Sequence, residues 1–94
     1  MALNQQMNKY LITYDLKNKS IRNYLSLFNA IKSLGPWWHY LDSTWIIKTN
    51  LNSQQIWSML GQHLLTNDHI LVIKIDNSDK WGWLPQDAWN WLNS

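Results

Sequence analysis

The stretch WWHYLDSTWIIKT (residues 37–49) decides the fold, because it contains two strands joined by a tight turn. Residues 37–41 and 44–49 are rich in the aromatic and β-branched side chains that favour strands. The polar pair Asp42-Ser43 between them is typical of a short hairpin turn. The hairpin therefore supplies two neighbouring strands, and the rest of the fold follows from the segments on either side.

A strand and a helix precede the hairpin. Residues 9–16, KYLITYDL, are rich in β-branched and aromatic side chains and predict a strand. In residues 20–35 apolar residues recur at three- and four-residue steps, which predicts a helix with one apolar face. Ser20 is expected to cap its start, and Gly35-Pro36 to end it.

A helix and a strand also follow the hairpin. Residues 52–65 show helical periodicity, with Ser53 as the expected N-cap. Residues 69–75, HILVIKI, predict another strand. The remaining tail begins with turn residues and is expected to end in a short helix, with Pro85 in its first turn.

This order of elements predicts an α+β, ferredoxin-like βαββαβ sandwich, in which both helices cover one face of a four-stranded antiparallel sheet. Right-handed crossovers place the first and third strands, residues 9–16 and 44–48, in the middle of the sheet. We expect one domain over residues 1–76. The Trp-rich tail, residues 77–94, is expected to pack on that domain or on a partner subunit.

The sheet face without helices is the first clue to function. Such a face normally alternates towards polar residues. In the strand 69–75, however, apolar side chains point to both faces. Leu71, Ile73 and Ile75 point to one face, and Ile70 and Val72 point to the other. We therefore expect the second face to be covered by the tail, by a second copy of the chain, or by both.

The composition limits the classes of function. The eight tryptophans and 46% hydrophobic residues in 94 positions are more than one small core needs. The net charge of +2 permits nucleic-acid binding without requiring it. Cysteine is absent, which excludes disulfides and thiolate metal sites. The sequence shows neither a signal-peptide pattern nor an apolar run of about 18 residues, so we expect a cytoplasmic protein with no membrane partner.

Several stretches together resemble the CRISPR-associated Cas-two superfamily, which includes the SinR-like proteins and the virulence-associated D toxins. They are the strand end Tyr14-Asp15, the basic helix start at Arg22, the Trp/Tyr hairpin and the closing DHILVIKI. The resemblance runs from about residue 9 to residue 76. The hairpin and the tail segment GWLPQDAWNWL are most similar to the SinR-like branch.

The resemblance implies a symmetric homodimer on a ferredoxin-like fold. Some members of the superfamily are metal-dependent nucleases acting on RNA or DNA, and others are non-catalytic scaffolds that hold DNA. The family's functional carboxylate lies at the end of the first strand, where Asp15 matches it. Basic residues just after that strand correspond to Lys17, Lys19 and Arg22.

Asp15 is the candidate catalytic and metal-binding residue. Magnesium (or manganese) prefers oxygen ligands, often one or two carboxylates with several waters, and a two-fold dimer would bring two copies of Asp15 to one ion. Strand alternation places Asp15 on the face opposite Tyr14, which is the face expected to form the dimer. The alternative is that Asp15 only accepts backbone hydrogen bonds in the following loop.

The basic residues and the histidines have two interpretations each. Lys17, Lys19 and Arg22 would hold a phosphate, or would simply be solvated in a polar loop. His39 would act as a general base, or would be a hydrogen-bonded interface residue. The other two histidines, His63 and His69, are weaker candidates, and no spacing predicts a zinc site.

The aromatic residues of the hairpin also have two interpretations. Trp37, Trp38, Tyr40 and Trp45 are expected to fill the core and the subunit interface, where Trp and Tyr are enriched. Alternatively, they would stack nucleobases on the sheet, which needs exposed rings surrounded by basic groups.

Three functions follow from the sequence. The first is a Cas-two/SinR-like homodimer with weak Mg²⁺-dependent nuclease activity at paired Asp15 residues. The second is a non-catalytic dimeric interaction or scaffold module in which Asp15 is structural. The third is a single-stranded RNA-binding protein that uses the aromatic residues of the sheet.

Overall fold

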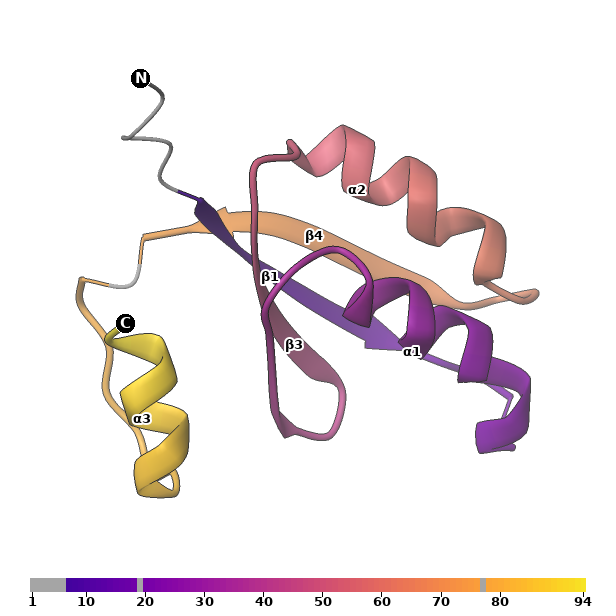
Figure 1. Cartoon of the computed structure of the whole chain (residues 1–94). Coiled ribbons are helices and arrows are strands. Elements are labelled where there is room, and N and C mark those ends of the chain that lie inside the picture. Colours follow the sequence, from indigo (N-terminus) through magenta and orange to yellow (C-terminus); the bar gives the residue numbers. More distant parts are fainter. Residues whose placement is uncertain (1–6, 19, 77) are drawn as a thin grey trace.

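A computed structural model describes residues 7–18, 20–76 and 78–94. The chain forms a four-stranded antiparallel sheet with α1 and α2 on one face, and α3 lies apart from them (Figure 1). The elements are β1 (Asn8–Asp15), the 3-10 turn η2 (Ile21–Tyr24), α1 (Leu25–Lys32), β2 (Trp37–Leu41), β3 (Thr44–Thr49), α2 (Ser53–Leu60), the 3-10 turn η3 (Gly61–His63), β4 (His69–Ile75) and α3 (Gln86–Leu92).

The predicted ferredoxin-like α+β fold is confirmed. The strand order is β2-β3-β1-β4, so β1 and β3 are central as expected. In the registers of β1, Ile12 lies opposite Trp45 of β3 and Val72 of β4. These side chains point towards the helices, where Ile12 and Trp45 are buried and Val72 packs against the main core.

The main core lies between the sheet and the two helices. Tyr10, Ile12, Trp45 and Ile47 enter it from the sheet, because alternate residues of a strand share one face. The helices contribute apolar side chains four residues apart: Leu27 and Ile31 from α1, and Ile56 and Leu60 from α2. Helical periodicity therefore predicted both helices, but Leu25, on the apolar side expected for the first of them, is 51% exposed, and Leu27 is buried instead.

The two helix starts differ from their predictions. Asn52, not Ser53, caps α2: its side chain accepts from the Gln55 amide N–H at 2.8 Å, and the Gln55 side chain accepts from the Asn52 N–H at 2.9 Å. This capping box satisfies two backbone donors, which Ser53 inside the first turn does not do. Ser20 does stand at the N-cap of η2, but its side chain makes no capping hydrogen bond there.

Gly35 sets the path from α1 into β2. Its φ of 153° lies in a region that favours glycine. A Cβ at this position would also collide with the Lys48 carbonyl oxygen of β3. The chain passes close to β3 here, and the Lys48 N–H donates to the Pro36 carbonyl at 3.0 Å. α1 thus ends at Lys32, before the predicted stop, and Gly35 is instead the point where the chain passes close to β3.

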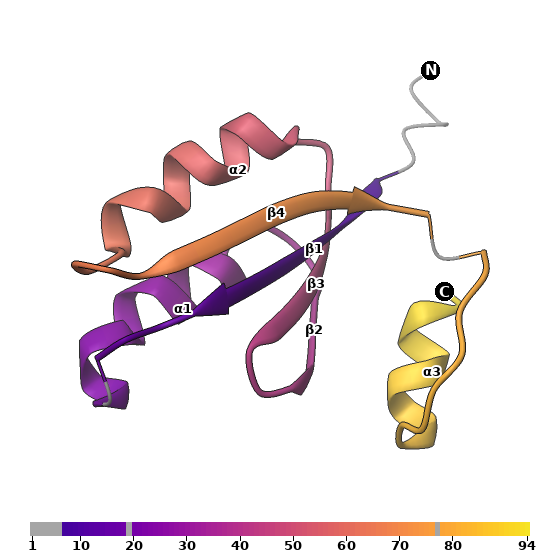
Figure 2. The same ribbon diagram turned by 180° about the vertical axis from the view of Figure 1, so that it is seen from behind.

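α3 lies on the side of the sheet away from α1 and α2 (Figure 2) and packs against part of the second face. Trp38 of β2 and Ile46 of β3 form a second core with Ala88 and Leu92 of α3. The Trp38 indole N–H donates to the Ala88 carbonyl at 3.2 Å, which fixes the helix on the sheet. The tail therefore packs against the β2–β3 half of this face.

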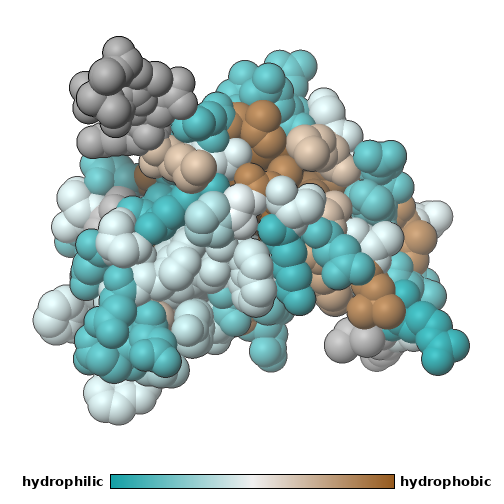
Figure 3. Space-filling model, in the orientation of Figure 1, coloured by the Kyte–Doolittle hydropathy of each residue, from teal (hydrophilic) through white to brown (hydrophobic). Residues whose placement is uncertain are grey.

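The β1–β4 half of the second face is open. Leu71 and Ile73 of β4 are 54% and 47% exposed, and Leu11 of β1 is half-buried beside Ile73. On the opposite, helix-covered side, brown apolar residues gather over α1 and α2, whereas the surface at α3 is teal to white (Figure 3). Apolar residues on both sides of β4 are thus confirmed. Ile75 packs against the second core, whereas the described residues leave Leu71 and Ile73 about half-exposed.

Candidate functional site

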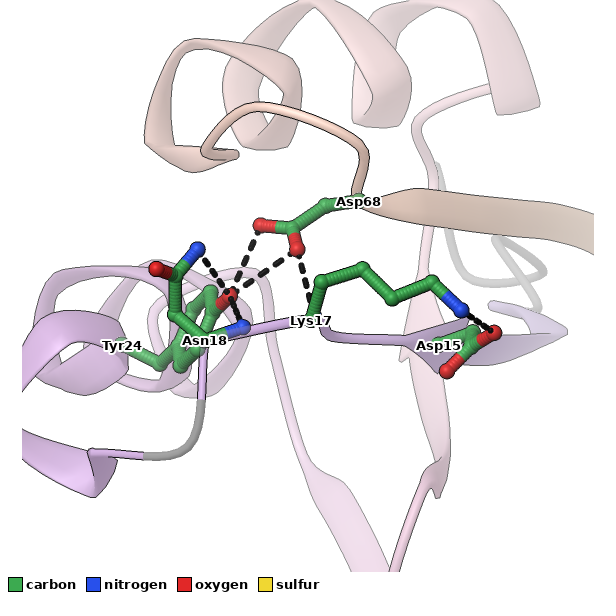
Figure 4. A network of polar contacts seen from close by, with 5 residues as sticks. All are labelled: Asp15, Lys17, Asn18, Tyr24 and Asp68. Atoms are coloured by element: carbon green, nitrogen blue, oxygen red, sulfur yellow. Dashed lines mark hydrogen bonds and ion pairs between the residues drawn. The ribbon is translucent and has the colours of Figure 1, made fainter.

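Asp15 is the last residue of β1 and lies on the open half of the second face. Its side chain is 66% exposed and forms an ion pair with Lys17, with 2.7 Å between Oδ2 and Nζ (Figure 4). The hydrogen bond and the charge of Asp15 raise the pKa of Lys17 above its ordinary value. The structure therefore places Asp15 on the predicted face, next to a lysine that stays protonated.

His69 lies directly opposite Asp15, because β1 and β4 pair antiparallel from Lys9↔Ile75 to Asp15↔His69. Both side chains are exposed, and they line a shallow hollow of about 320 Å³ together with Thr13 and Leu71. His69 was a weaker candidate than His39 on sequence alone. The signal that could have found it is the register that results when β4 is aligned antiparallel with β1.

One chain does not provide a complete metal site. Among the described residues, no three His, Cys, Asp or Glu side chains gather closely enough to hold an ion. Asp15 and His69 supply one carboxylate and one imidazole. A divalent ion with two carboxylate ligands would need Asp15 of a second copy, and imidazole nitrogen would favour Mn²⁺ over Mg²⁺.

Asp68, which the sequence analysis did not single out, fixes the backbone around this hollow (Figure 4). Its carboxylate accepts from the amide N–H groups of Lys17 and Leu65, each at 2.8 Å, and from the Tyr24 hydroxyl at 2.9 and 3.0 Å. Burial alone would raise the pKa of Asp68, but these hydrogen bonds hold it below its ordinary value. Asp68 therefore joins the loop after β1 to η2 and to the start of β4.

The predicted basic residues lie at different places. Lys17 contacts Asp15, whereas Arg22 is exposed on η2 and forms no ion pair with Asp15 in the described structure. Lys19 lies outside the described residues. Of the two predicted phosphate-binding residues that the structure describes, Lys17 lies at the candidate carboxylate and Arg22 does not pair with it.

Two of the four aromatic residues predicted at the interface are buried inside the chain. Trp38 is 3% exposed beneath α3, and Trp45 is 2% exposed in the main core, so neither offers a free ring to a partner or to a nucleobase. Trp37 and Tyr40 are 43% and 44% exposed. A surface role in the hairpin therefore stays a prediction for Trp37 and Tyr40 only.

His39 has a structural environment. Its ring stacks on Trp45, with 3.8 Å between ring centroids, and its Nδ1 lies 3.1 Å from the Thr44 carbonyl oxygen. The Trp45 indole N–H in turn donates to the Tyr14 hydroxyl at 3.0 Å. This packing supports the alternative in which His39 is a hydrogen-bonded residue and not a general base.

Comparisons with known proteins support the fold. Neither a protein-family model nor a curated protein matches the chain. The structure is similar to the crystal structure of a hypothetical protein, TT1823, from Thermus thermophilus, with a TM-score of 0.58 and 18% sequence identity. The match covers 84% of this chain and 95% of that chain. Separately, none of the helices in the described ranges is both long and apolar enough to cross a membrane.

Proposed function

We propose that the protein is a Cas-two/SinR-like homodimer that hydrolyses phosphodiester bonds of RNA or DNA, using Mg²⁺ or Mn²⁺ held between two copies of Asp15. The observation that carries the proposal is the position of Asp15 on the same open half-face as Leu71 and Ile73. A second copy that covers these apolar side chains is thereby brought close to the carboxylate. In this proposal the dimer works in the cytoplasm.

The open half-face favours a second copy as its cover. Exposed apolar patches of this kind mark interaction sites in small proteins. A two-fold axis matches a surface with itself, so one patch on each chain is enough for a closed dimer. Leu71 and Ile73 also stand on β4, an edge strand whose outer backbone groups pair with no other strand of the described sheet.

The side chains around Asp15 have defined roles in this proposal. A bound divalent ion would polarise a phosphoryl oxygen and lower the pKa of a bound water. Asp15 and its symmetry mate would hold the ion, with His69 as an additional ligand. Lys17 remains protonated and would exchange its partner, Asp15, for a phosphate oxygen of the substrate.

A second candidate function is a non-catalytic dimeric interaction module. The ion pair between Asp15 and Lys17 favours it, because that contact already provides the carboxylate with a cation. Here the same half-face forms the dimer, and Asp15 stabilises only the loop that follows β1. The two candidates share the interface and differ in chemistry.

Cleavage assays with matched variants separate the two candidates. Purified wild type, Asp15→Ala and Asp42→Ala would be incubated with labelled single- and double-stranded RNA and DNA, with Mg²⁺, Mn²⁺ or EDTA. Asp42 is the control because it is an exposed aspartate in the hairpin turn. If the protein is a nuclease that acts through Asp15, wild type and Asp42→Ala will cleave in the presence of the metal and Asp15→Ala will not. Equal cleavage by all three, or none by any, contradicts the nuclease.

A further inference from the structure

Two tryptophans of the tail are almost completely exposed. Trp81 and Trp83 are each 99% exposed, in the irregular segment between β4 and α3. An indole side chain buries roughly 150–250 Å² when it packs, and it rarely stays fully in water without a role. These two rings therefore do not belong to either core of the chain.

The two rings border a hollow of about 430 Å³, within the usual size of a small-molecule site. Trp89, partly buried against the second core, forms a third aromatic wall. The remaining lining combines apolar, amide, hydroxyl and ammonium groups: Ser78, Lys80, Gly82, Leu84, Gln86 and Asn93. The hollow thus has aromatic walls and several hydrogen-bonding groups.

The two tryptophans suit a flat ligand. Trp81 and Trp83 both line the hollow, and the face of an indole stacks on planar rings such as nucleobases. Gly82 between them carries no side chain, which keeps the space open towards Trp89.

The polar lining indicates which flat ligand. The amides of Gln86 and Asn93 offer both donors and acceptors, which match the edges of nucleobases. Tryptophan faces also attract cations, as in this chain where the Lys48 ammonium lies 4.5 Å from the centre of the Trp91 ring. Lys80 in the lining of the hollow, however, would repel an organic cation. We propose that the Trp81–Trp83 hollow binds an unpaired nucleobase of single-stranded RNA or DNA.

The charge of the tail indicates how the base is held. Residues 76–94 contain three aspartates and one lysine, whereas the whole chain has a net charge of +2. The tail is therefore a poor phosphate-binding surface, and stacking supplies the affinity. Binding through phosphates falls steeply with salt, so stacking at this hollow predicts a shallow salt dependence.

The choice of a nucleobase over other planar ligands rests on the proposed function, but the hollow is separate from Asp15.

Indole N–H signals in NMR spectra would report on each tryptophan, and the variants Trp81→Phe and Trp83→Phe would assign them. Oligothymidylate, free adenosine and tetramethylammonium chloride would be titrated separately at low and high salt. We expect shifts at Trp81 and Trp83 with both nucleic-acid probes and little change with salt.

Variants complete the test. Trp81→Ala and Trp83→Ala should each weaken oligothymidylate binding roughly 5- to 150-fold, as expected for the loss of one stacked ring. Trp57→Ala, which removes a half-exposed tryptophan of α2, should not weaken it. Unchanged binding in the Trp81 and Trp83 variants, a steep salt dependence, or shifts with tetramethylammonium alone would overturn the inference. Oligothymidylate binding by a wild type that cleaves none of the substrates would count against the nuclease only.

Discussion

Asp15 and His69 are a register pair across β1 and β4, and both side chains open onto one hollow of the second face. The pairing follows from the chain path, because β4 begins where β1 ends. Asp68, one residue before His69, is hydrogen-bonded to the backbone of Lys17 and so holds the two strand ends together. The carboxylate and the imidazole therefore have a fixed relation within each chain.

His69→Ala should weaken Mn²⁺ binding by roughly 10- to 100-fold if His69 is a ligand or orients one. The fold should be unaffected, because the side chain is exposed. Electron paramagnetic resonance of added Mn²⁺ would measure the free ion directly, without an activity assay. His63→Ala is the matched control, since His63 lies away from this hollow, 3.1 Å from the Ser26 hydroxyl. Equal Mn²⁺ affinity in both variants would exclude His69 as a ligand.

Asp68→Asn should lower the free energy of unfolding by about 1 kcal/mol at neutral pH, because an amide replaces a partly solvated, hydrogen-bonded carboxylate. The pKa of Asp68 is lowered in the folded state, so its contribution is complete above the ordinary value of 3.8 and is lost as the pH falls through the folded-state pKa. Urea denaturation at several pH values would measure this.

The difference between wild type and Asp68→Asn should therefore shrink in acid. Asp42→Asn is the control, because only the backbone oxygen of Asp42 accepts a hydrogen bond, from the Tyr14 hydroxyl at 3.4 Å. A stability difference that stays constant from neutral pH into acid would show that the charge of Asp68 is not what stabilises the loop.

The fold and the face of Asp15 could be predicted from the sequence because both depend on local periodicity. Strand alternation alone places Asp15 opposite the helix side. The position of His69 opposite Asp15 depends on the register between β1 and β4, which tertiary contacts set. Asp68 could not be predicted because it lies in a loop, where no periodic pattern marks its role. The composition indicated more tryptophan than one small core needs, but not which of the tryptophans stay exposed; the structure shows that Trp81 and Trp83 do.

Leu92→Ala should cost about 2–3 kcal/mol of folding stability, because Leu92 is 6% exposed in the second core between α3 and the sheet. Trp83→Ala should leave the stability unchanged, because its ring is exposed. Chemical denaturation followed by far-UV circular dichroism would compare the two. Equal stability of wild type and Leu92→Ala would mean that α3 does not pack on the second face.

Gly35→Ala should destabilise the protein by more than about 1 kcal/mol, because alanine is strained at a φ of 153° and its Cβ would meet the Lys48 carbonyl oxygen. Gly82→Ala is the matched control: its Cβ would lie 3.9 Å from the Trp89 ring, an ordinary contact. Thermal unfolding would show a lower Tm for Gly35→Ala only. A similar Tm for both variants would contradict the close approach of the chain to β3.

Leu71→Lys with Ile73→Lys should convert a dimer into a folded monomer, because both side chains are about half-exposed and their replacement places like charges on the open half-face. Circular dichroism would check that the double variant is folded. Asn50→Lys with Thr66→Lys, at two exposed positions outside the strands, would control for the added charge. Loss of dimer in the control pair as well would show that net charge, not the half-face, governs association.

Sedimentation equilibrium of the wild type at micromolar concentration is the most direct test of whether a second copy covers this half-face. The account predicts a mass of twice the 11.3 kDa of one chain, falling to 11.3 kDa in the Leu71→Lys, Ile73→Lys variant. A wild-type mass of 11.3 kDa across the accessible concentrations, with Leu71 and Ile73 in contact with water, would contradict it.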